Sequence, residues 1–189
     1  MINIAYRLLL TFNATSLLVI IFLVQKSYTL GSLFPKCPYL VGIPNIVSYL
    51  GYLVVPILLT GFSILLSSLL GKDEFKPSEI NSIEHANNSF LPSYLGYFFV
   101  ALSIGNWETL CFVYGILFLF TFLSQALYFN PLFLLFGFEF YNITTKSGTS
   151  IFLISRYKYK KPDEVDVPLA SRINNYTFIE RGGNGSRYG

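Results

Sequence analysis

A run of 25 residues without a charged side chain, residues 46–70, constrains the fold of this chain more than any other feature. At about 1.5 Å per residue, a helix of this length crosses the roughly 30 Å hydrocarbon core of a bilayer with some tilt. Pro56 lies within the run, at a position where it can kink the helix. The run therefore predicts a transmembrane helix around which the rest of the fold is built.

Three more apolar runs extend this pattern to an all-α membrane protein with four transmembrane helices, at about 6–25, 46–70, 90–107 and 109–129. Composition supports the class, because 53% of the residues are hydrophobic and only 12% are charged. The third run has few apolar residues before Gly105, so a short span and a re-entrant segment both fit it. A cleaved signal peptide is the alternative for the first run, but no small-x-small site precedes Gln25.

We expect three regions along the chain. Residues 1–136 form the four-helix transmembrane domain, with an external loop at 26–45 and a cytoplasmic connector at 71–89. Ile80 and Ile83 suggest a short interfacial helix in the connector, with Ser78 as its N-cap. Residues 137–181 form a small cytoplasmic β-hairpin and a partner-docking region, and residues 182–189 form a flexible, disordered tail.

The hairpin follows from an alternating pattern that begins after residue 136. Side chains alternate over residues 138–143 and again over residues 150–157, and Lys146-Ser147-Gly148 lies between the two stretches. A period of two is typical of strands, and a short connection containing glycine is typical of a hairpin. Two strands alone are marginally stable in water, so the hairpin has to pack on helix ends, on a partner or on another copy.

Basic residues are distributed asymmetrically along the chain, since eight of the 13 Lys and Arg residues lie after residue 145. With four spans, one side of the membrane receives eleven basic residues and the other receives only Lys26 and Lys36. The positive-inside rule then predicts that the N- and C-termini are both cytoplasmic.

No group of residues predicts enzyme chemistry. The chain has one histidine, His85, and its neighbour Glu84 would point about 100° away from it in a helix. Spacings such as CxxC and HExxH are missing, as is a glycine-rich phosphate loop. Cys37 and Cys111 lie in a predicted loop and in an apolar run, which gives no disulfide framework. We therefore expect no catalytic residue, no metal ion and no cofactor.

Small residues four positions apart predict two places of close helix packing. The pairs are Ser63 with Ser67 and Ala101 with Gly105. Small side chains allow helix backbones to approach one another, either within one chain or between copies of it. The sequence leaves these two alternatives open.

A basic segment after the predicted hairpin combines cations with aromatic rings. Attraction to anionic lipid, docking of another protein and contact with nucleic acid are three interpretations of such a segment. Because the hairpin needs something to pack against, we expect the partner-binding residues here. They are Arg156, Tyr157, Lys158, Tyr159, Lys160 and Lys161.

Two stretches, Asn88-Ser89-Phe90-Leu91-Pro92-Ser93-Tyr94-Leu95-Gly96-Tyr97-Phe98-Phe99 and Tyr128-Phe129-Asn130-Pro131, resemble KwaA, the membrane subunit of the bacterial Kiwa anti-phage defence system. The resemblance implies an inner-membrane protein that forms a homo-oligomer. It also implies a soluble, DNA-binding partner, KwaB, so that no direct contact of this chain with nucleic acid is expected. Membrane lipid is a further expected partner.

Three functions follow as hypotheses. The first is a membrane sensor and scaffold that holds a soluble effector at the inner membrane. The alternative is a small channel or transporter subunit, with polar residues such as Ser124 and Gln125 on a pore-facing helix. The third, a membrane-bound enzyme that uses Glu84 and His85, is the least favoured by the residues.

Overall fold

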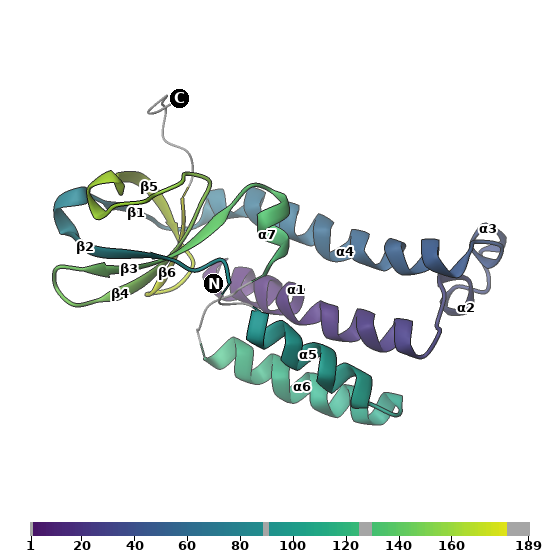
Figure 1. The fold of residues 1–189 in the computed structure, drawn as a ribbon. Coiled ribbons are helices and arrows are strands. Elements are labelled where there is room, and N and C mark those ends of the chain that lie inside the picture. Colours follow the sequence, from purple (N-terminus) through teal and green to yellow (C-terminus); the bar gives the residue numbers. More distant parts are fainter. Residues whose placement is uncertain (1, 89–90, 125–129, 181–189) are drawn as a thin grey trace. The chain divides into compact units, whose positions relative to one another are not determined.

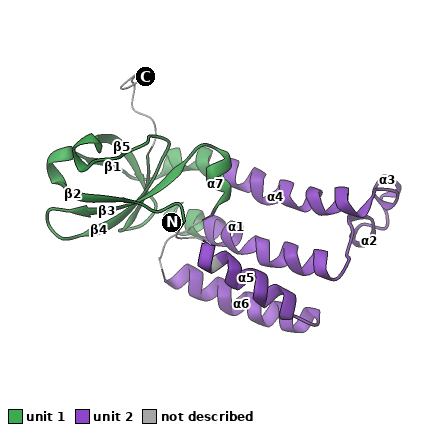
Figure 2. Cartoon of the chain, in the orientation of Figure 1, with its two compact units in different colours: residues 1–7, 63–89, 131–189 green, residues 8–62, 90–130 purple. Residues whose placement is uncertain are grey.

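The computed structural model describes residues 2–88, 91–124 and 130–180, and its internal contacts divide the chain into two compact units (Figure 2). The sheet unit comprises residues 1–7, 63–89 and 131–189, and the helical unit comprises residues 8–62 and 90–130. The predicted disordered tail at 182–189 lies outside the described residues. So does the predicted end of the fourth span at 125–129, which includes Gln125.

Six α-helices account for most of the helical unit (Figure 1). Its core gathers side chains from α1, α4, α5 and the start of α6, among them Leu18, Phe22, Tyr52, Ala101 and Leu110. The helices are α1 (Ile2–Gln25), α2 (Leu30–Leu33), α3 (Pro38–Val41), α4 (Asn45–Leu66), α5 (Leu91–Ser103) and α6 (Trp107–Leu123), of which α1 begins and α4 ends in the sheet unit.

The prediction of four transmembrane helices is wrong. In the part of the chain that the structure describes, two helical stretches are long and apolar enough to cross a membrane, Asn3–Gln25 and Asn45–Leu69. Helix α5 has 13 residues and α6 has 17, which correspond to about 20 and 26 Å and fall short of a bilayer core. The break between them is built by Asn106, whose side chain accepts a hydrogen bond from the backbone N–H of Thr109 (2.9 Å) and caps α6.

A buried polar junction joins α1 and α4 inside the helical unit. Asn13, Thr60 and Asn130 are each 1% exposed or less. With the Asn13 amide oriented so that both of its atoms are satisfied, its nitrogen donates to the carbonyl of Pro56 (3.1 Å) and its oxygen accepts from the Asn130 amide (2.8 Å). The Thr60 hydroxyl lies 2.7 Å from the same Asn13 oxygen. The polar side chains of this junction therefore satisfy one another, as burial requires.

Gly31 is the position where the helical unit leaves no room for a side chain. A Cβ on Gly31 would lie 2.7 Å from the carbonyl oxygen of Leu40 and 2.8 Å from the Cα of Val41, both of which are backbone atoms of α3. Gly31→Ala is expected to lower the free energy of unfolding by about 1–3 kcal/mol, because α2 and α3 must separate. A urea titration of the full chain in detergent, monitored by the fluorescence of Trp107, measures the change.

The control for Gly31 is Gly42, which follows α3 and has no atom within 4 Å of the position of a Cβ. Gly42→Ala should leave the urea midpoint within about 0.5 kcal/mol of the parent. Equal midpoints for Gly31→Ala and the parent would contradict the close approach of α2 and α3.

A six-stranded mixed sheet forms the sheet unit, which corrects the all-α fold class. Its strand order is β1-β5-β6-β4-β3-β2, and every neighbouring pair is antiparallel except β4 and β6, which are parallel. The predicted small hairpin is β3 and β4, two strands of this larger sheet. The strands are β1 (Lys72–Phe75), β2 (Ile80–His85), β3 (Glu139–Thr145), β4 (Ser150–Ser155), β5 (Val167–Arg172) and β6 (Thr177–Glu180).

The predicted interfacial helix in the connector is also wrong, because residues 72–75 and 80–85 are β1 and β2. Between them lies a single 3₁₀ turn, η2 (Pro77–Glu79). Ile80 is 3% exposed and Ile83 is partly buried, and both pack into the core beneath the sheet. Their burial depends on β3, which pairs with β2 from more than 50 residues further along the chain.

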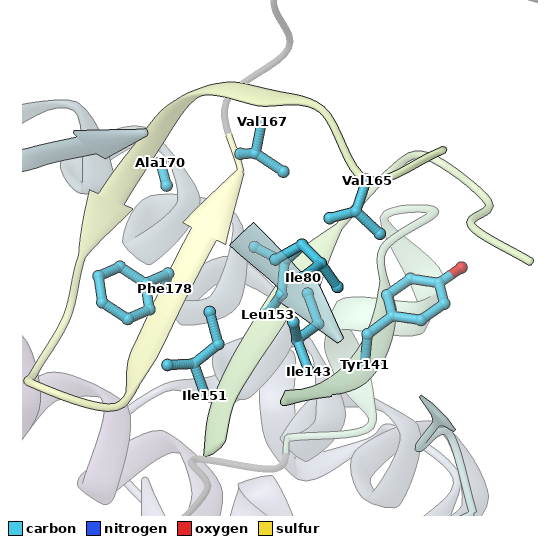
Figure 3. Packing of buried hydrophobic residues seen from close by; sticks show 9 residues of the cluster. All are labelled: Ile80, Tyr141, Ile143, Ile151, Leu153, Val165, Val167, Ala170 and Phe178. Atoms are coloured by element: carbon cyan, nitrogen blue, oxygen red, sulfur yellow. The ribbon is translucent and has the colours of Figure 1, made fainter. Parts of the chain in front are cut away.

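The sheet is strongly curled, because its two edge strands follow one another in sequence. Strands β1 and β2 lie at opposite edges, yet only residues 76–79 connect them. Five peptide units reach about 18 Å when fully extended, whereas the edges of a flat six-stranded sheet would be about 24 Å apart. The sheet therefore wraps around the core cluster in Figure 3, which includes Tyr141, Ile143, Leu153, Val167 and Phe178.

The opposite face of the same strands is covered by an aromatic cluster. Phe140 stacks on Phe152 (ring centroids 5.7 Å apart, 15° between planes), and Phe133 contacts both Phe138 and Phe140 edge-on. Phe133 belongs to α7 (Leu132–Leu135), the short helix that precedes β3. Both faces of β3 and β4 are therefore buried, and residues 151–155 of β4 are buried without interruption.

Candidate functional site

The basic segment, residues 156–161, leaves the sheet directly after β4 and alternates between outward cations and inward tyrosines. Arg156, Lys158 and Lys160 are exposed, whereas Tyr157 and Tyr159 are partly buried. Arg156 lies over the ring of Phe138, with 4.6 Å between its guanidinium carbon and the ring centroid. The Tyr159 hydroxyl bonds to a carboxylate of the sheet unit. The Tyr157 ring contacts the Tyr159 ring, with 6.4 Å between the ring centroids.

Glu180, a buried carboxylate at the end of β6, holds Tyr159. The Tyr159 hydroxyl lies 2.9 Å from both carboxylate oxygens, and the Ser155 hydroxyl donates to one of them at 2.5 Å. Glu180 is 4% exposed, and this burial raises the pKa of its carboxyl, while the hydrogen bonds from Ser155 and Tyr159 oppose part of the rise. The carboxylate thus ties the basic segment to the parallel pair β4–β6.

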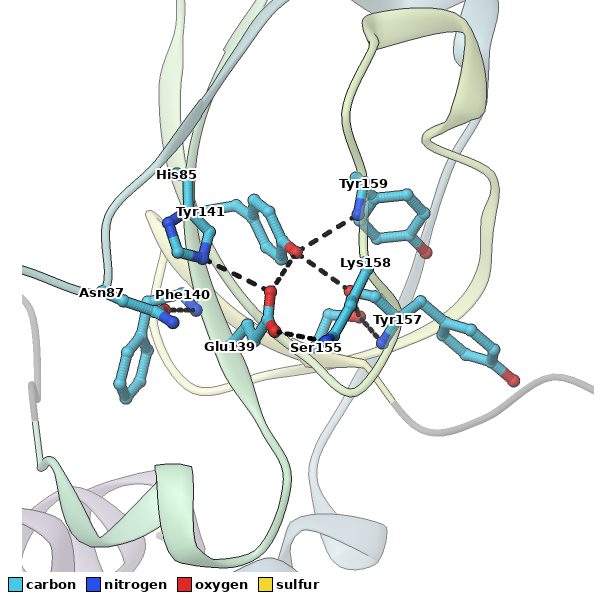
Figure 4. Close-up of polar contacts among 9 residues, drawn as sticks. All are labelled: His85, Asn87, Glu139, Phe140, Tyr141, Ser155, Tyr157, Lys158 and Tyr159. Carbon is cyan, nitrogen blue, oxygen red and sulfur yellow. Dashed lines mark hydrogen bonds and ion pairs between the residues drawn. The ribbon is translucent and has the colours of Figure 1, made fainter. Parts of the chain in front are cut away.

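A second anchor is the hydroxyl of Tyr141 on β3 (Figure 4). It donates to Glu139 (2.7 Å), lies 3.2 Å from the carbonyl of Tyr157, and accepts a hydrogen bond from the backbone N–H of Tyr159 (3.2 Å). Burial raises the pKa of both Tyr141 and Tyr159, so the two hydroxyls stay protonated at neutral pH and act as donors. The basic segment is therefore held at its backbone by Tyr141 and at the Tyr159 side chain by Glu180.

Glu139 contacts side chains from three segments, which are β2, β3 and the basic segment. Its carboxylate accepts from Tyr141, lies 3.3 Å from His85 Nε2 on β2, and lies 3.7 Å from Lys158 Nζ. The His85 ring also meets the Tyr141 ring edge-on, with centroids 5.5 Å apart. These groups line an open hollow of about 350 Å³, here called the hollow, whose lining residues are Ile83, His85, Glu139, Tyr141, Lys158, Tyr159 and Lys160.

Acidic groups next to the basic segment balance part of its charge. The Glu164 carboxylate accepts hydrogen bonds from the backbone N–H groups of Lys160 (2.9 Å) and Lys161 (3.3 Å), and these bonds lower its pKa. Glu164 belongs to η3 (Pro162–Glu164), the turn that follows the segment. The segment is a patterned surface in which cations face outward and its backbone is held by carboxylates and hydroxyls.

The four residues predicted to pack helices closely differ in burial. Ser63 and Ser67 are both buried, and the Ser63 carbonyl accepts a hydrogen bond from the Tyr6 hydroxyl of α1 (3.0 Å). Ala101 is fully buried in the core of the helical unit. Gly105 is exposed, and no atom lies within 4 Å of where its Cβ would be.

Glu84 and His85, the residues of the third hypothesis, are neighbours on β2 rather than on a helix. Neighbouring side chains of a strand point to opposite faces, so only His85 reaches the hollow, where its partner is Glu139. Within the described ranges no three His, Cys, Asp or Glu side chains come together as ligands for a metal ion.

Sequence reasoning missed the two carboxylates that organise the site. Glu139 and Glu180 lie 41 residues apart and are brought to the two ends of one hydrogen-bonded network by Tyr141 and Tyr159. One local signal existed for Glu180, since it directly follows two apolar residues, Phe178 and Ile179. In the structure all four residues of Thr177–Glu180 are buried. Glu139 gives no such signal, because its partner His85 comes from another strand.

Comparison with known proteins identifies a family. A family model described as KwaA, anti-phage protein KwaA, matches residues 6–179. The match covers residues of both units, including the hollow and the basic segment. Neither the curated proteins nor the solved structures contain a match to the chain.

Proposed function

The chain belongs to the KwaA family of anti-phage proteins, and on this premise we propose that it is a membrane-held scaffold whose sheet unit docks a soluble effector resembling KwaB. The observation that carries the proposal is the basic segment, which displays four cations, while Tyr141 holds its backbone and Glu180 holds the side chain of its Tyr159. A surface held in one conformation loses little entropy when a partner binds. In this proposal the chain recognises and positions the effector and performs no catalysis itself.

The proposed membrane attachment rests on the helical unit. The outward side of α4 carries large apolar side chains that are about half exposed or more. Lipid is the environment that such a face needs. The residues are Ile46, Val47, Leu50, Val54, Val55, Leu58 and Phe62.

An aromatic group near the end of α1 supports the same attachment. Trp107 donates from its indole nitrogen to the Tyr28 hydroxyl (3.2 Å), and its ring meets Phe22 edge-on at 5.1 Å. The Lys26 ammonium lies 6.0 Å from the centre of the Phe22 ring. Tryptophan, tyrosine and lysine together are typical of the boundary between hydrocarbon and water.

The proposed location is the bacterial inner membrane, with the sheet unit in the cytoplasm. A chain that crosses at α1 and returns at α4 brings residues 1–7 and 63–89 to the same side. Arg7, Lys72 and Lys76 lie on that side, which agrees with the positive-inside rule. The proposal includes association of copies of the chain, for which a differently tagged copy is expected to co-purify.

Co-purification from native membranes tests the docking function. A variant in which Arg156, Lys158, Lys160 and Lys161 are all replaced by serine should lose the soluble partner and at least about tenfold of the protection from phage, because its interface charges are gone. The control replaces three cations of the same unit outside the basic segment, Lys72, Lys76 and Lys146, by serine, and should keep both the partner and the protection. Retention of the partner and of protection by the first variant would refute the proposal.

A further inference from the structure

The two lysines of the hollow have fewer interactions than its carboxylate, Glu139. Lys158 is 78% exposed and lies 3.7 Å from Glu139, a long and solvated ion pair. The Lys160 ammonium makes no ion pair with any residue that the structure describes. Both ammonium groups are therefore open to an incoming anion.

Glu139, by contrast, is held by donors from three segments. Its side chain is 21% exposed and accepts from Tyr141, with His85 and Lys158 as its charged or chargeable neighbours. An anion that enters the hollow takes Lys158 away from this carboxylate and meets its negative charge at close range. His85 then remains as the neighbour that can offset the charge of Glu139.

The net charge of the sheet unit indicates which class of anion the hollow can bind. The sequence of this unit contains eleven Lys and Arg residues against nine Asp and Glu residues, so its excess of positive charge is small. Nucleic acid and anionic bilayers are extended polyanions, and binding them depends on a broad basic surface. Two lysines that line one hollow together with a single carboxylate instead match a short segment with one or two carboxylates.

We propose that the hollow receives an acidic peptide segment of the soluble partner, whose carboxylate is bound by Lys158 and Lys160, and that Glu139 opposes this binding unless His85 offsets its charge. The inference rests on the proposed docking function and names what the partner presents. Glu139 thus sets how strongly the surface binds an acidic segment, through its own charge rather than through contact with the partner.

The test measures binding of a fluorescein-labelled peptide of alternating glutamate and threonine to the full chain in detergent micelles, by fluorescence anisotropy. K158E with K160E should weaken binding by at least about tenfold, and E139Q should strengthen it by about threefold or more. The controls are K146E, in the turn between β3 and β4, and E84Q, next to His85 on the same strand. E84Q changes the charge of the chain by the same amount as E139Q, and K146E makes one of the two Lys-to-Glu changes of K158E with K160E at a position outside the hollow. Both controls should leave the affinity unchanged.

A double-mutant cycle separates the role of His85 from a merely structural one. H85Q should weaken peptide binding, and adding E139Q should restore the affinity to that of E139Q alone, because His85 acts through Glu139. A loss in H85Q that E139Q does not reverse would contradict this role. Equal resistance to pulse proteolysis in urea shows that each variant keeps the fold.

Two further arms decide between anion classes. Stronger binding of an oligothymidine or of phosphatidylglycerol vesicles than of the peptide would overturn the inference, as would an affinity that K158E with K160E leaves unchanged. If only this inference is wrong, the four-serine variant still loses the partner, but E139Q does not change the affinity for the peptide. Failure of the proposed function would appear as retention of the partner by the four-serine variant.

Discussion

Glu180→Ala is expected to lower the free energy of unfolding of the sheet unit by about 2–5 kcal/mol. The substitution leaves the hydroxyls of Ser155 and Tyr159 facing a space without an acceptor, and each unsatisfied buried group costs about 1–3 kcal/mol. Because Tyr159 fixes the basic segment, the variant should also lose partner binding. Pulse proteolysis of the full chain in urea measures the stability, and the same preparation serves for co-purification.

Glu180→Gln is the matched control, because it keeps an acceptor for both hydroxyls and removes only the buried charge. The pKa of Glu180 is raised above its ordinary value of 4.5, so the folded state binds this proton more tightly than the unfolded state does. The stability that this proton contributes is fully present below pH 4.5 and is lost as the pH rises through the raised pKa. The parent should therefore lose stability relative to Glu180→Gln over that range. A constant difference between the two across the range would contradict the burial of a charged Glu180.

Phe140→Ala should be about as damaging, with a loss of about 3–5 kcal/mol. Phe140 is fully buried, stacks on Phe152 and contacts Phe133, so truncation leaves a cavity between β3, β4 and α7. The surrounding rings are rigid and cannot collapse into that cavity without losing their mutual contacts. The urea midpoint in pulse proteolysis reports the loss.

Leu135→Ala provides the comparison for Phe140→Ala. Leu135 lies in α7 but is 68% exposed, so its truncation should change the free energy of unfolding by no more than about 0.5 kcal/mol. If Phe140→Ala proved as mild as Leu135→Ala, the aromatic cluster would not be the second core of the sheet unit. The two substitutions together test whether the aromatic cluster is buried on the face of the sheet opposite the core cluster in Figure 3.

Local patterns predicted those elements whose stability is decided within one stretch of sequence. The uncharged run at 46–70 corresponds to α4 and the turn after it, and the apolar run at 6–25 corresponds to most of α1. The alternation around Lys146 to Gly148 corresponds to β3 and β4, which a short turn joins. In each case hydrophobic periodicity and a local break carry the information.

The same patterns failed where length or pairing depends on distant residues. The run at 90–107 looked long enough to span only when its interfacial flank was counted, whereas the run at 109–129 has 21 residues. The described helices end at Ser103 and Leu123. Strands β1, β2, β5 and β6 are short and partly polar, and each is stabilised by a neighbour far away in the sequence. A single stretch of sequence contains no record of such a neighbour.

The candidate site also has a part that local sequence predicted and a part that depends on distant residues. The sequence by itself determined which residues supply the cations, Arg156 to Lys161, because charge is a property of each residue. Only the tertiary structure decided that Glu180 holds the Tyr159 side chain and that Tyr141 holds the backbone. It also decided that His85 and Lys158 both lie beside Glu139. Those contacts exist because a curled sheet brings β2, β3, β6 and the basic segment together, and strand pairing of this kind is set by packing over the whole unit.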